Sequence, residues 1–249
     1  MKNTKALLSI LFVLAVFAAC SKKNDSSTAP VVKGDVIETT LTSNDITYKT
    51  FTGKNISQYK GILVMGSGND ESNPSPGALN GAAETDLCTK AAAGGYVAAI
   101  VQYRKTPGNA DWNASAKIIG DDYNTVITAL AAKYSIDKSK SVVGGYSYAT
   151  FMLLTNSAYY NSIPYSKGIL AACGATSADA AGKLNNPIFA IACSGNKEGD
   201  FSGKELYDHM KLNSAVKLAS VGITDGSCST HCGGNWTSQL YTQLTTWLP

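Results

Sequence analysis

Ser147 lies in the stretch GGYSYA, between a run of small and β-branched residues (141–145) and a helix-like segment (148–160). Small residues two positions away on either side, Gly145 and Ala149, approximate the pattern G-x-S-x-G with alanine in the last place. At a sharp strand-to-helix turn, this pattern holds a serine in a strained conformation suited to nucleophilic attack. Serine is also a good N-cap residue, so a role in starting the helix is the alternative. The position between a strand and a helix favours the nucleophile.

A serine hydroxyl becomes a good nucleophile only when a neighbouring base removes its proton. The sequence has two histidines, His209 and His231. His209 lies near the end of the predicted helix GKELYDHMKLN, which should end at the sheet edge opposite the serine turn, and a cation there suits the helix dipole. His231 follows the last predicted strand and is flanked by two cysteines. We therefore predict His231 as the base, and the alternative is a bystander in a disulfide-bridged loop.

The remaining pattern predicts an α/β fold. Two β-rich runs, VIETTL and ITYKTF, separated by TSND, predict an antiparallel hairpin. After the hairpin, apolar strands alternate with helices, which is typical of a parallel sheet covered on both faces. We expect a mostly parallel sheet of eight strands. Beyond the hairpin, the predicted strands are 61–66, 96–103, 141–145, 167–173, 186–193 and 216–222, and the predicted helices are 84–95, 115–134, 148–160, 203–213 and 235–248.

The N-terminus has the features of a secretory signal. Two lysines precede a short apolar run, 6–17, which is too short to span a bilayer as a stable helix. The ending FAAC resembles a bacterial lipobox, which implies cleavage before Cys20 and acylation of its thiol. A plain signal peptide with a chance cysteine is the alternative. We predict a signal peptide at 1–19, a lipidated cysteine with a flexible tether at 20–33, and one domain at 34–249.

Charge and composition exclude other classes of protein. Removing residues 1–19 leaves 19 basic residues against 18 acidic ones, and the only arginine is Arg104. Because forked guanidinium groups dominate base and phosphate recognition, we expect no nucleic-acid partner. The stretch GSGND lacks the patterns of a dinucleotide fold and of a phosphate-binding loop.

From about Val36 to Leu248, the order of predicted elements resembles the α/β-hydrolase fold. The segment YSIDKSKSVVGGYSYAT resembles the segment that carries the serine in the esterase and dienelactone-hydrolase-like branches of that superfamily. The resemblance implies a Ser-His-acid triad with Ser147 as nucleophile and no cofactor. It also places the histidine on the loop after the last strand, where His231 stands.

The resemblance places the triad acid on the loop after the preceding strand, within FAIACSGNKEGD. Asp200 is preferred narrowly because aspartate is the more usual side chain. Glu198 is the alternative because it stands three residues after Gly195, a common spacing in the superfamily. Asp179 and Asp225 are further candidates.

The oxyanion hole implied by the resemblance needs two backbone N–H groups. One belongs to Tyr148, the residue after the nucleophile. The other comes from MGSGND, where Ser67 is the first choice and Gly66 or Gly68 are alternatives in register. Met65 stands where the superfamily often has histidine, but the donor is a main-chain group and the mechanism is unaffected.

Five cysteines besides Cys20 leave at least one unpaired. We expect Cys173 to pair with Cys193, because both end consecutive strands, and Cys228 to pair with Cys232. Cys88 would then be free, and crossed pairings such as Cys193 with Cys228 stay open. The stretch CSTHC offers two thiols and an imidazole to a metal ion, but an oxidising compartment favours a disulfide, so no metal site is predicted.

The sequence predicts a secreted, lipid-anchored, monomeric serine hydrolase that cleaves small or polymeric carboxylic esters in a bacterial cell envelope. Trp112 and Tyr146 are candidates for contact with an aromatic or sugar ring of the substrate, as is Tyr148. Because a fold does not determine function, a non-catalytic surface binding protein on a hydrolase scaffold is the first alternative. A small serine peptidase is the second.

Overall fold

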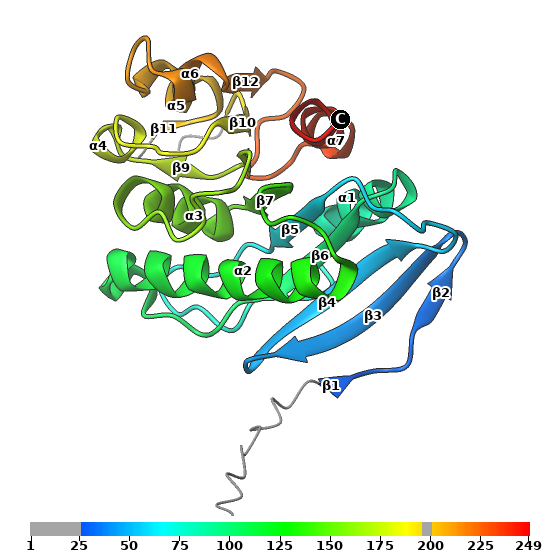
Figure 1. Cartoon of the computed structure of the whole chain (residues 1–249). Coiled ribbons are helices and arrows are strands. Elements are labelled where there is room, and N and C mark those ends of the chain that lie inside the picture. Colours follow the sequence, from blue (N-terminus) through cyan, green and yellow to red (C-terminus); the bar gives the residue numbers. More distant parts are fainter. Residues whose placement is uncertain (1–25, 196–200) are drawn as a thin grey trace, which may run out of the picture.

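One mixed β-sheet runs through the part of the chain that the computed structural model describes, residues 26–195 and 201–249 (Figure 1). Among these residues the sheet has ten strands, in the order β1-β3-β4-β6-β5-β7-β8-β10-β12, with β2 paired to β3. The strands are β1 (Ser26–Ser27), β2 (Val31–Lys33), β3 (Val36–Ser43), β4 (Ile46–Gly53), β5 (Ile62–Gly66), β6 (Val97–Gln102), β7 (Ser141–Tyr146), β8 (Ile169–Ala172), β10 (Ile188–Cys193) and β12 (Val221–Asp225).

The predicted hairpin is confirmed as β3 and β4, which pair antiparallel from Val36 opposite Gly53 to Ser43 opposite Ile46. Asn44 and Asp45 form the two-residue turn with φ angles of 48° and 64°. Asparagine and aspartate tolerate this left-handed conformation better than most residues, and such turns match the twist of the strands they join.

From β6 to β12, all neighbouring strands run parallel. Every residue of β5, β7, β8 and β10 is buried, as expected for strands covered on both faces. The sheet from β3 to β12 has eight strands, the predicted number, although β12 begins later in the chain than predicted, and β1 and β2 extend the sheet at the hairpin edge. The mostly parallel sheet with an N-terminal antiparallel hairpin is therefore confirmed.

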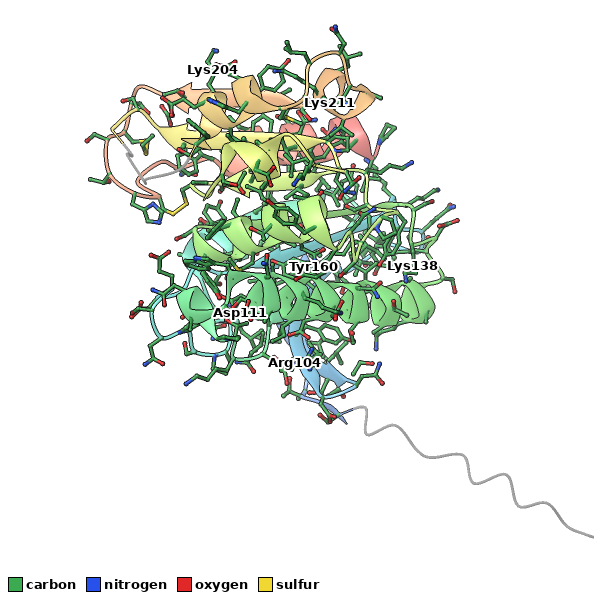
Figure 2. All side chains as sticks on the ribbon, turned by 90° about the vertical axis from the view of Figure 1, so that its left-hand side faces the viewer. Arg104, Asp111, Lys138, Tyr160, Lys204 and Lys211 are labelled. Atoms are coloured by element: carbon green, nitrogen blue, oxygen red, sulfur yellow. A yellow bond between two sulfur atoms is a disulfide. The ribbon has the colours of Figure 1, made fainter. Side chains whose placement is uncertain are left out.

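Helices cover both faces of the sheet (Figure 1). Apolar residues of α2, α3 and α5 pack in one core cluster, and those of α1 and α7 pack in the other. Figure 2 views the α2 and α3 side, with Asp111 near the start of α2 and Lys138 beyond its end. The longer helices are α1 (Ala82–Ala93), α2 (Trp112–Tyr134), α3 (Tyr148–Tyr159), α5 (Gly203–His209) and α7 (Thr237–Trp247). Shorter elements are η1 (Gly108–Ala110), α4 (Ala178–Ala181), α6 (Ala215–Leu218) and a small sheet of β9 (Ala175–Thr176) with β11 (Phe201–Ser202).

The prediction of the last strand at 216–222 is wrong for most of its length, because α6 occupies its first part and β12 begins only at Val221. The side chain of Ser214 caps α6 by accepting a hydrogen bond from the Lys217 backbone N–H (3.1 Å). The Lys217 ammonium group donates to the carbonyl oxygen atoms of Asp208 and Met210. These local hydrogen bonds outweigh the β-propensity of the segment.

The segment predicted as a flexible tether, 20–33, is not entirely unstructured. Ser26–Ser27 and Val31–Lys33 pair antiparallel with β3, although all five residues are exposed. The predicted signal peptide and Cys20 lie outside the described residues. Among the described helices, none combines the length and the hydropathy that a transmembrane span requires.

Candidate active site

Ser147 occupies the turn between β7 and α3 and has φ 52° and ψ −120°. A positive φ is strained for serine, and such strain is typical of functional sites. Two hydrogen bonds hold the turn: the Ser147 N–H donates to the Ala172 carbonyl oxygen (3.1 Å), and the Phe151 N–H donates to the Ser147 carbonyl oxygen (3.0 Å). Its side chain accepts no cap hydrogen bond from α3, so the N-cap alternative is not supported.

The close approach of β7 and α3 requires the small residues beside Ser147. A Cβ atom on Gly145 would lie 2.8 Å from the Ala149 Cβ and 2.9 Å from the Thr150 backbone nitrogen, closer than real Cβ atoms come. Ala149 itself is fully buried, and its methyl group fits the space left by Gly145. The alanine that departs from the G-x-S-x-G pattern is therefore compatible with the turn.

His231 lies beside Ser147, with its Nε2 atom 2.7 Å from the Ser147 Oγ atom. For the hydroxyl to donate this hydrogen bond, Nε2 must be unprotonated, so the neutral imidazole carries its proton on Nδ1. His209, by contrast, is exposed at the end of α5. Its ring stacks on Phe201, and its Nδ1 atom lies 2.9 Å from the Glu205 carbonyl oxygen.

The two preferred candidates for the triad acid, Asp200 and Glu198, lie outside the described residues. The Asp225 carboxylate accepts hydrogen bonds from the Ser227 hydroxyl, from Trp236 Nε1 (2.8 Å) and from the Ser227 N–H, and these bonds lower its pKa. The Asp179 carboxylate contacts the Tyr159 hydroxyl and Lys183 on the exposed surface. Asp225 is thus hydrogen-bonded to residues near the start and at the end of the loop that carries His231, and Asp179 is hydrogen-bonded to the last residue of α3.

The loop after β5 passes directly beside the nucleophile. A Cβ atom on Gly68 would lie 3.1 Å from the Ser147 Cβ and 3.7 Å from its Oγ. The carbonyl oxygen of Ser67 accepts a hydrogen bond from the Tyr103 hydroxyl (2.8 Å), and its own hydroxyl donates to the Ala78 carbonyl oxygen (3.0 Å). Tyr148 is the first residue of α3, where N–H groups have no acceptor within the helix. Both expected sources of oxyanion donors therefore flank Ser147.

Glu84 is a buried carboxyl group near this loop that the sequence analysis does not identify. It lies in the first turn of α1, is 5% exposed, and lines a hollow beside Ser147 and His231. Burial raises its pKa above the usual 4.5, and the hydrogen bond from its own backbone N–H offsets this only in part. A glutamate in the first turn of a predicted helix gives no sequence signal of burial, because exposed acidic residues are common there.

A cavity of about 700 Å³ opens at Ser147 and His231. Trp112, Tyr148 and Phe151 line one side of it, and the Trp112 and Phe151 rings pack edge to face with centroids 4.8 Å apart. Phe151 is absent from the sequence predictions, although its position one helical turn after Ser147 could have indicated it. The remaining lining residues are Asn69, Asp70, Glu71, Gly174 and Ala175.

Tyr146 does not line this cavity but the second hollow, of about 410 Å³, on the Glu84 side of Ser147. It is 6% exposed, and its hydroxyl has no hydrogen-bond partner among the described residues. Tyr146 therefore offers a substrate little surface, whereas Trp112 is half-buried in the larger cavity.

The expected cysteine pairing is wrong. Cys173 bonds to Cys232 and Cys193 bonds to Cys228, while Cys88 is free and buried, as predicted. Cys193 is level with Asp225 on β12, so the loop after β12 begins beside it. The loop then crosses to the end of β8, a path that strand order alone does not reveal. The Cys193–Cys228 pairing had remained open as an alternative.

Ligand atoms of Cys173, His231 and Cys232 lie within 4.8 Å of one another, which is close enough for a shared metal ion. The two sulfur atoms are bonded to each other, however, and zinc requires thiolates. The group therefore does not fit a metal ion while the disulfide is formed.

No family model matches the chain, and no curated protein sequence matches it either. Solved structures with the same fold do match. A cold-adapted esterase from an Arctic intertidal metagenomic library is 13% identical with a TM-score of 0.58, over 90% of this chain and all of that one. A Klebsiella pneumoniae protein provisionally described as a dienelactone hydrolase is 13% identical with a TM-score of 0.56, over 83% of this chain and 93% of that one.

Porphyromonas gingivalis dipeptidyl peptidase 4 is 15% identical with a TM-score of 0.54, over 91% of this chain but 35% of that one. These likenesses and the sheet order define the class of protein: the chain has the α/β-hydrolase fold.

Proposed function

We propose that this protein is a serine hydrolase that cleaves carboxylic esters. The observation that carries the proposal is the 2.7 Å hydrogen bond between Ser147 Oγ and His231 Nε2, at a strained strand-to-helix turn of an α/β-hydrolase fold. A serine that only started a helix would need neither the strained backbone nor an imidazole in contact with its hydroxyl. The same contact argues against a binding protein that has lost catalysis.

In the proposed first step, His231 Nε2 takes the proton of the Ser147 hydroxyl while Oγ attacks the ester carbonyl carbon. The carbonyl oxygen becomes an oxyanion that the Tyr148 N–H and the N–H of Ser67 stabilise, with Gly66 or Gly68 as alternatives to Ser67. Removal of one such donor costs about 3 kcal/mol of transition-state stabilisation. His231 then protonates the departing alcohol, and an acyl-enzyme remains.

Deacylation repeats these steps with water as the nucleophile. His231 takes a proton from the water, whose oxygen attacks the acyl carbon, and then returns that proton to Ser147. We assign the carboxylate that orients the imidazole to Asp200, with Glu198 as the alternative. Both follow β10, in the part of the chain that the structure does not describe.

We propose that the substrate places a ring or another flat apolar group against Trp112 and Phe151. The 700 Å³ cavity leads from these rings to the nucleophile, and aromatic faces bind aromatic or sugar rings. Tyr146 is a weaker contact because little of it is exposed. The substrate class is a small or polymeric ester.

A serine peptidase is the second candidate, because the fold also matches the peptidase structure described above. A panel of short acyl esters and aminoacyl anilides separates the two: turnover of the esters alone supports the esterase.

We further propose that the protein is secreted, lipidated on Cys20 and held as a monomer in a bacterial cell envelope. The sequence of the N-terminal segment supports this proposal. Metabolic labelling with a fatty-acid analogue tests it, because Cys20→Ala should abolish incorporation.

Labelling with a fluorophosphonate tests the central proposal. We expect a covalent adduct on Ser147 in the wild-type protein and none in Ser147→Ala. His231→Ala should label at a rate at least about 10³-fold lower, since the triad acts as a unit. His209→Ala is the matched control and should label normally. A folded wild-type protein that forms no adduct would contradict the hydrolase proposal and favour a binding function.

A further inference from the structure

The segment that carries His231, residues 226–236, connects β12 to α7 without a helix or strand of its own. His231 itself is exposed. Its neighbours form a local turn in which the Gly233 N–H donates to the Thr230 carbonyl oxygen (3.0 Å). A catalytic histidine on such a segment needs other constraints, because exposed loops are the most mobile parts of most folds.

Two disulfides attach this segment to the carboxyl edge of the sheet. Cys228 bonds to Cys193 at the end of β10, three residues before the histidine. Cys232 directly follows the histidine and bonds to Cys173, directly after β8. The two bridges therefore hold the same loop at different distances from the imidazole.

The Cys173–Cys232 bridge connects the histidine loop to a residue close to the nucleophile. Cys173 follows Ala172, whose carbonyl oxygen accepts the hydrogen bond from the Ser147 N–H (3.1 Å). The next residue, Gly174, is equally close, since a Cβ atom there would lie 3.0 Å from the Ser147 carbonyl oxygen. The Cys173 end of the bridge is thus fixed to the same turn that orients the serine.

The other end of the bridge contacts the imidazole directly. The Sγ atom of Cys232 lies 3.5 Å from His231 Nε2, the atom that faces Ser147. Cys173 is fully buried, whereas Cys232 is only half-buried, so the bridge joins a rigid core position to the exposed loop. A bridge of this kind limits the backbone freedom of His231, the residue that accepts the proton from Ser147 in the proposed mechanism.

We infer that the Cys173–Cys232 disulfide is a positioning element for His231, and that reducing it lowers turnover while the domain stays folded. The inference rests on the proposed function in assigning His231 as the base. Misplacement of a catalytic group by about 1 Å can cost about 100-fold in rate. The Cys193–Cys228 bridge holds the loop further from the imidazole and serves as the matched comparison.

The test compares two double variants, Cys173→Ser/Cys232→Ser and Cys193→Ser/Cys228→Ser, with the wild-type protein. On short acyl esters, we expect the first pair to lower kcat about 100-fold with little change in KM, and the second pair to change kcat little. Equal losses of kcat in both pairs, or none in the first, would overturn the inference. Circular dichroism confirms that each variant is folded.

A second readout does not depend on activity. Histidine-selective ¹⁵N nuclear magnetic resonance should show two imidazoles, and Ser147→Ala identifies the signal of His231 by moving it. We expect Cys173→Ser/Cys232→Ser to shift or broaden that signal, Cys193→Ser/Cys228→Ser to leave it in place, and His209 to stay constant throughout. An unchanged His231 signal in the first pair would overturn the inference even if the wild-type protein proved to have no hydrolase activity, so the two failures are distinguishable.

If the double variants do not fold, the same test is made by reducing the disulfides of the wild-type protein. A dithiol reagent supplies two electrons and two protons, the Cys173–Cys232 bond becomes two thiols, and the reagent becomes a cyclic disulfide. Alkylation followed by mass spectrometry identifies the cysteines that have become free thiols, and so shows which bridge has opened. Cys88 is a free thiol from the start, but it reacts slowly because it is buried. A chelator is included because the freed thiols and His231 could otherwise bind zinc. The His231 signal should change as this bridge opens, and an unchanged signal contradicts the inference.

Discussion

The conformation of Ser147 has an energetic cost that its neighbours offset. A non-glycine residue in a sparsely populated backbone region costs about 1–3 kcal/mol. The two backbone hydrogen bonds to Ala172 and Phe151 hold the turn, and the small residues on either side remove the steric conflict. The hydroxyl therefore contacts His231 and does not cap the N–H groups at the start of α3.

Substitutions on the two sides of Ser147 should have unequal effects. Gly145→Ala introduces a Cβ atom 2.9 Å from the Thr150 backbone nitrogen, so β7 and α3 must separate. We expect a loss of about 2 kcal/mol or more in the free energy of unfolding, together with a loss of fluorophosphonate labelling. Ala149→Gly, the matched change, should cost about 1 kcal/mol through helix propensity and keep labelling. Urea titration measures both, and equal effects would contradict the steric argument.

The buried carboxyl of Glu84 should make stability depend on pH. Its pKa in the folded state is raised above 4.5, so the folded protein holds this proton more tightly than the unfolded chain does. The stability from Glu84 is therefore complete below pH 4.5 and is lost as the pH rises through the folded-state pKa.

The neutral isostere Glu84→Gln separates this effect from others. We expect the variant to gain stability relative to the wild-type protein as the pH rises from 4 to 8, with the steepest change between 4.5 and the raised pKa of the folded state. Thermal unfolding across this range measures the difference, and Asp86→Gln, an exposed change on the same helix, is the control. A difference that does not vary with pH would show that the pKa of Glu84 is the same in the folded and unfolded states.

The sequence predicts Ser147 and His231 because each depends on a local signal: a serine between a strand and a helix, and a histidine just after the last strand. It does not predict the disulfide partners, because Cys173 meets Cys232 only through the path of a loop across two strand ends. Burial of Glu84 likewise depends on how the start of α1 meets the loop after β5, which no local pattern encodes.

At the scale of elements, α2 and α3 approach closely where Gly120 faces Asn156. The Asn156 amide donates to the Ala116 carbonyl oxygen (3.0 Å), and its side-chain oxygen accepts a hydrogen bond from the Ser162 N–H (3.1 Å). A Cβ atom on Gly120 would overlap with this side chain. The glycine therefore permits a polar link that joins the two helices and the loop after α3.

Gly120→Ala should destabilise the protein even though alanine is the better helix former. Alanine gains about 1 kcal/mol in helix propensity, but displacing the buried Asn156 amide costs about 1–3 kcal/mol. We expect a net loss of about 1 kcal/mol in the free energy of unfolding, measured by urea titration. In an Asn156→Ala background the same substitution should be neutral or stabilising. If Gly120→Ala destabilises both backgrounds equally, the overlap with Asn156 is not the cause.

Element prediction succeeds where burial and local chemistry agree. The hairpin turn at Asn44 and Asp45 and the fully buried strands β5 and β7 were predictable, because turn residues and runs of mostly apolar residues leave clear patterns. The last strand was misplaced because the segment 216–222 is apolar enough for either state, and the Ser214 cap decides in favour of a helix. The two-residue strands β9 and β11 are too short to leave a pattern.

At the scale of the whole molecule, the parallel arrangement brings the site together. The ends of β5, β7 and β8 and the loop after β12 meet at one edge of the sheet, as expected for parallel α/β folds. Residues as distant in sequence as Ser147 and His231 thereby come into contact. The opposite end of the strand order, at β1, β2 and β3, contributes no residue to the cavity at Ser147.

That separation predicts that removing the first strands leaves the site intact. The strands β1 and β2 are exposed throughout, and the ion pair from Lys33 to Glu38 (2.9 Å) is backed by a second from Lys49 (2.8 Å). A chain of residues 34–249 should lose about 1 kcal/mol or less in the free energy of unfolding relative to 26–249, since Lys33 is exposed and the buried Glu38 carboxylate keeps its ion pair with Lys49. Fluorophosphonate labelling of the two chains should be equal. Because truncation uncovers the edge of β3, the shorter chain should aggregate more readily on concentration. A loss of more than about 3 kcal/mol, or of labelling, would instead make β1 and β2 part of the folded core on which the site depends.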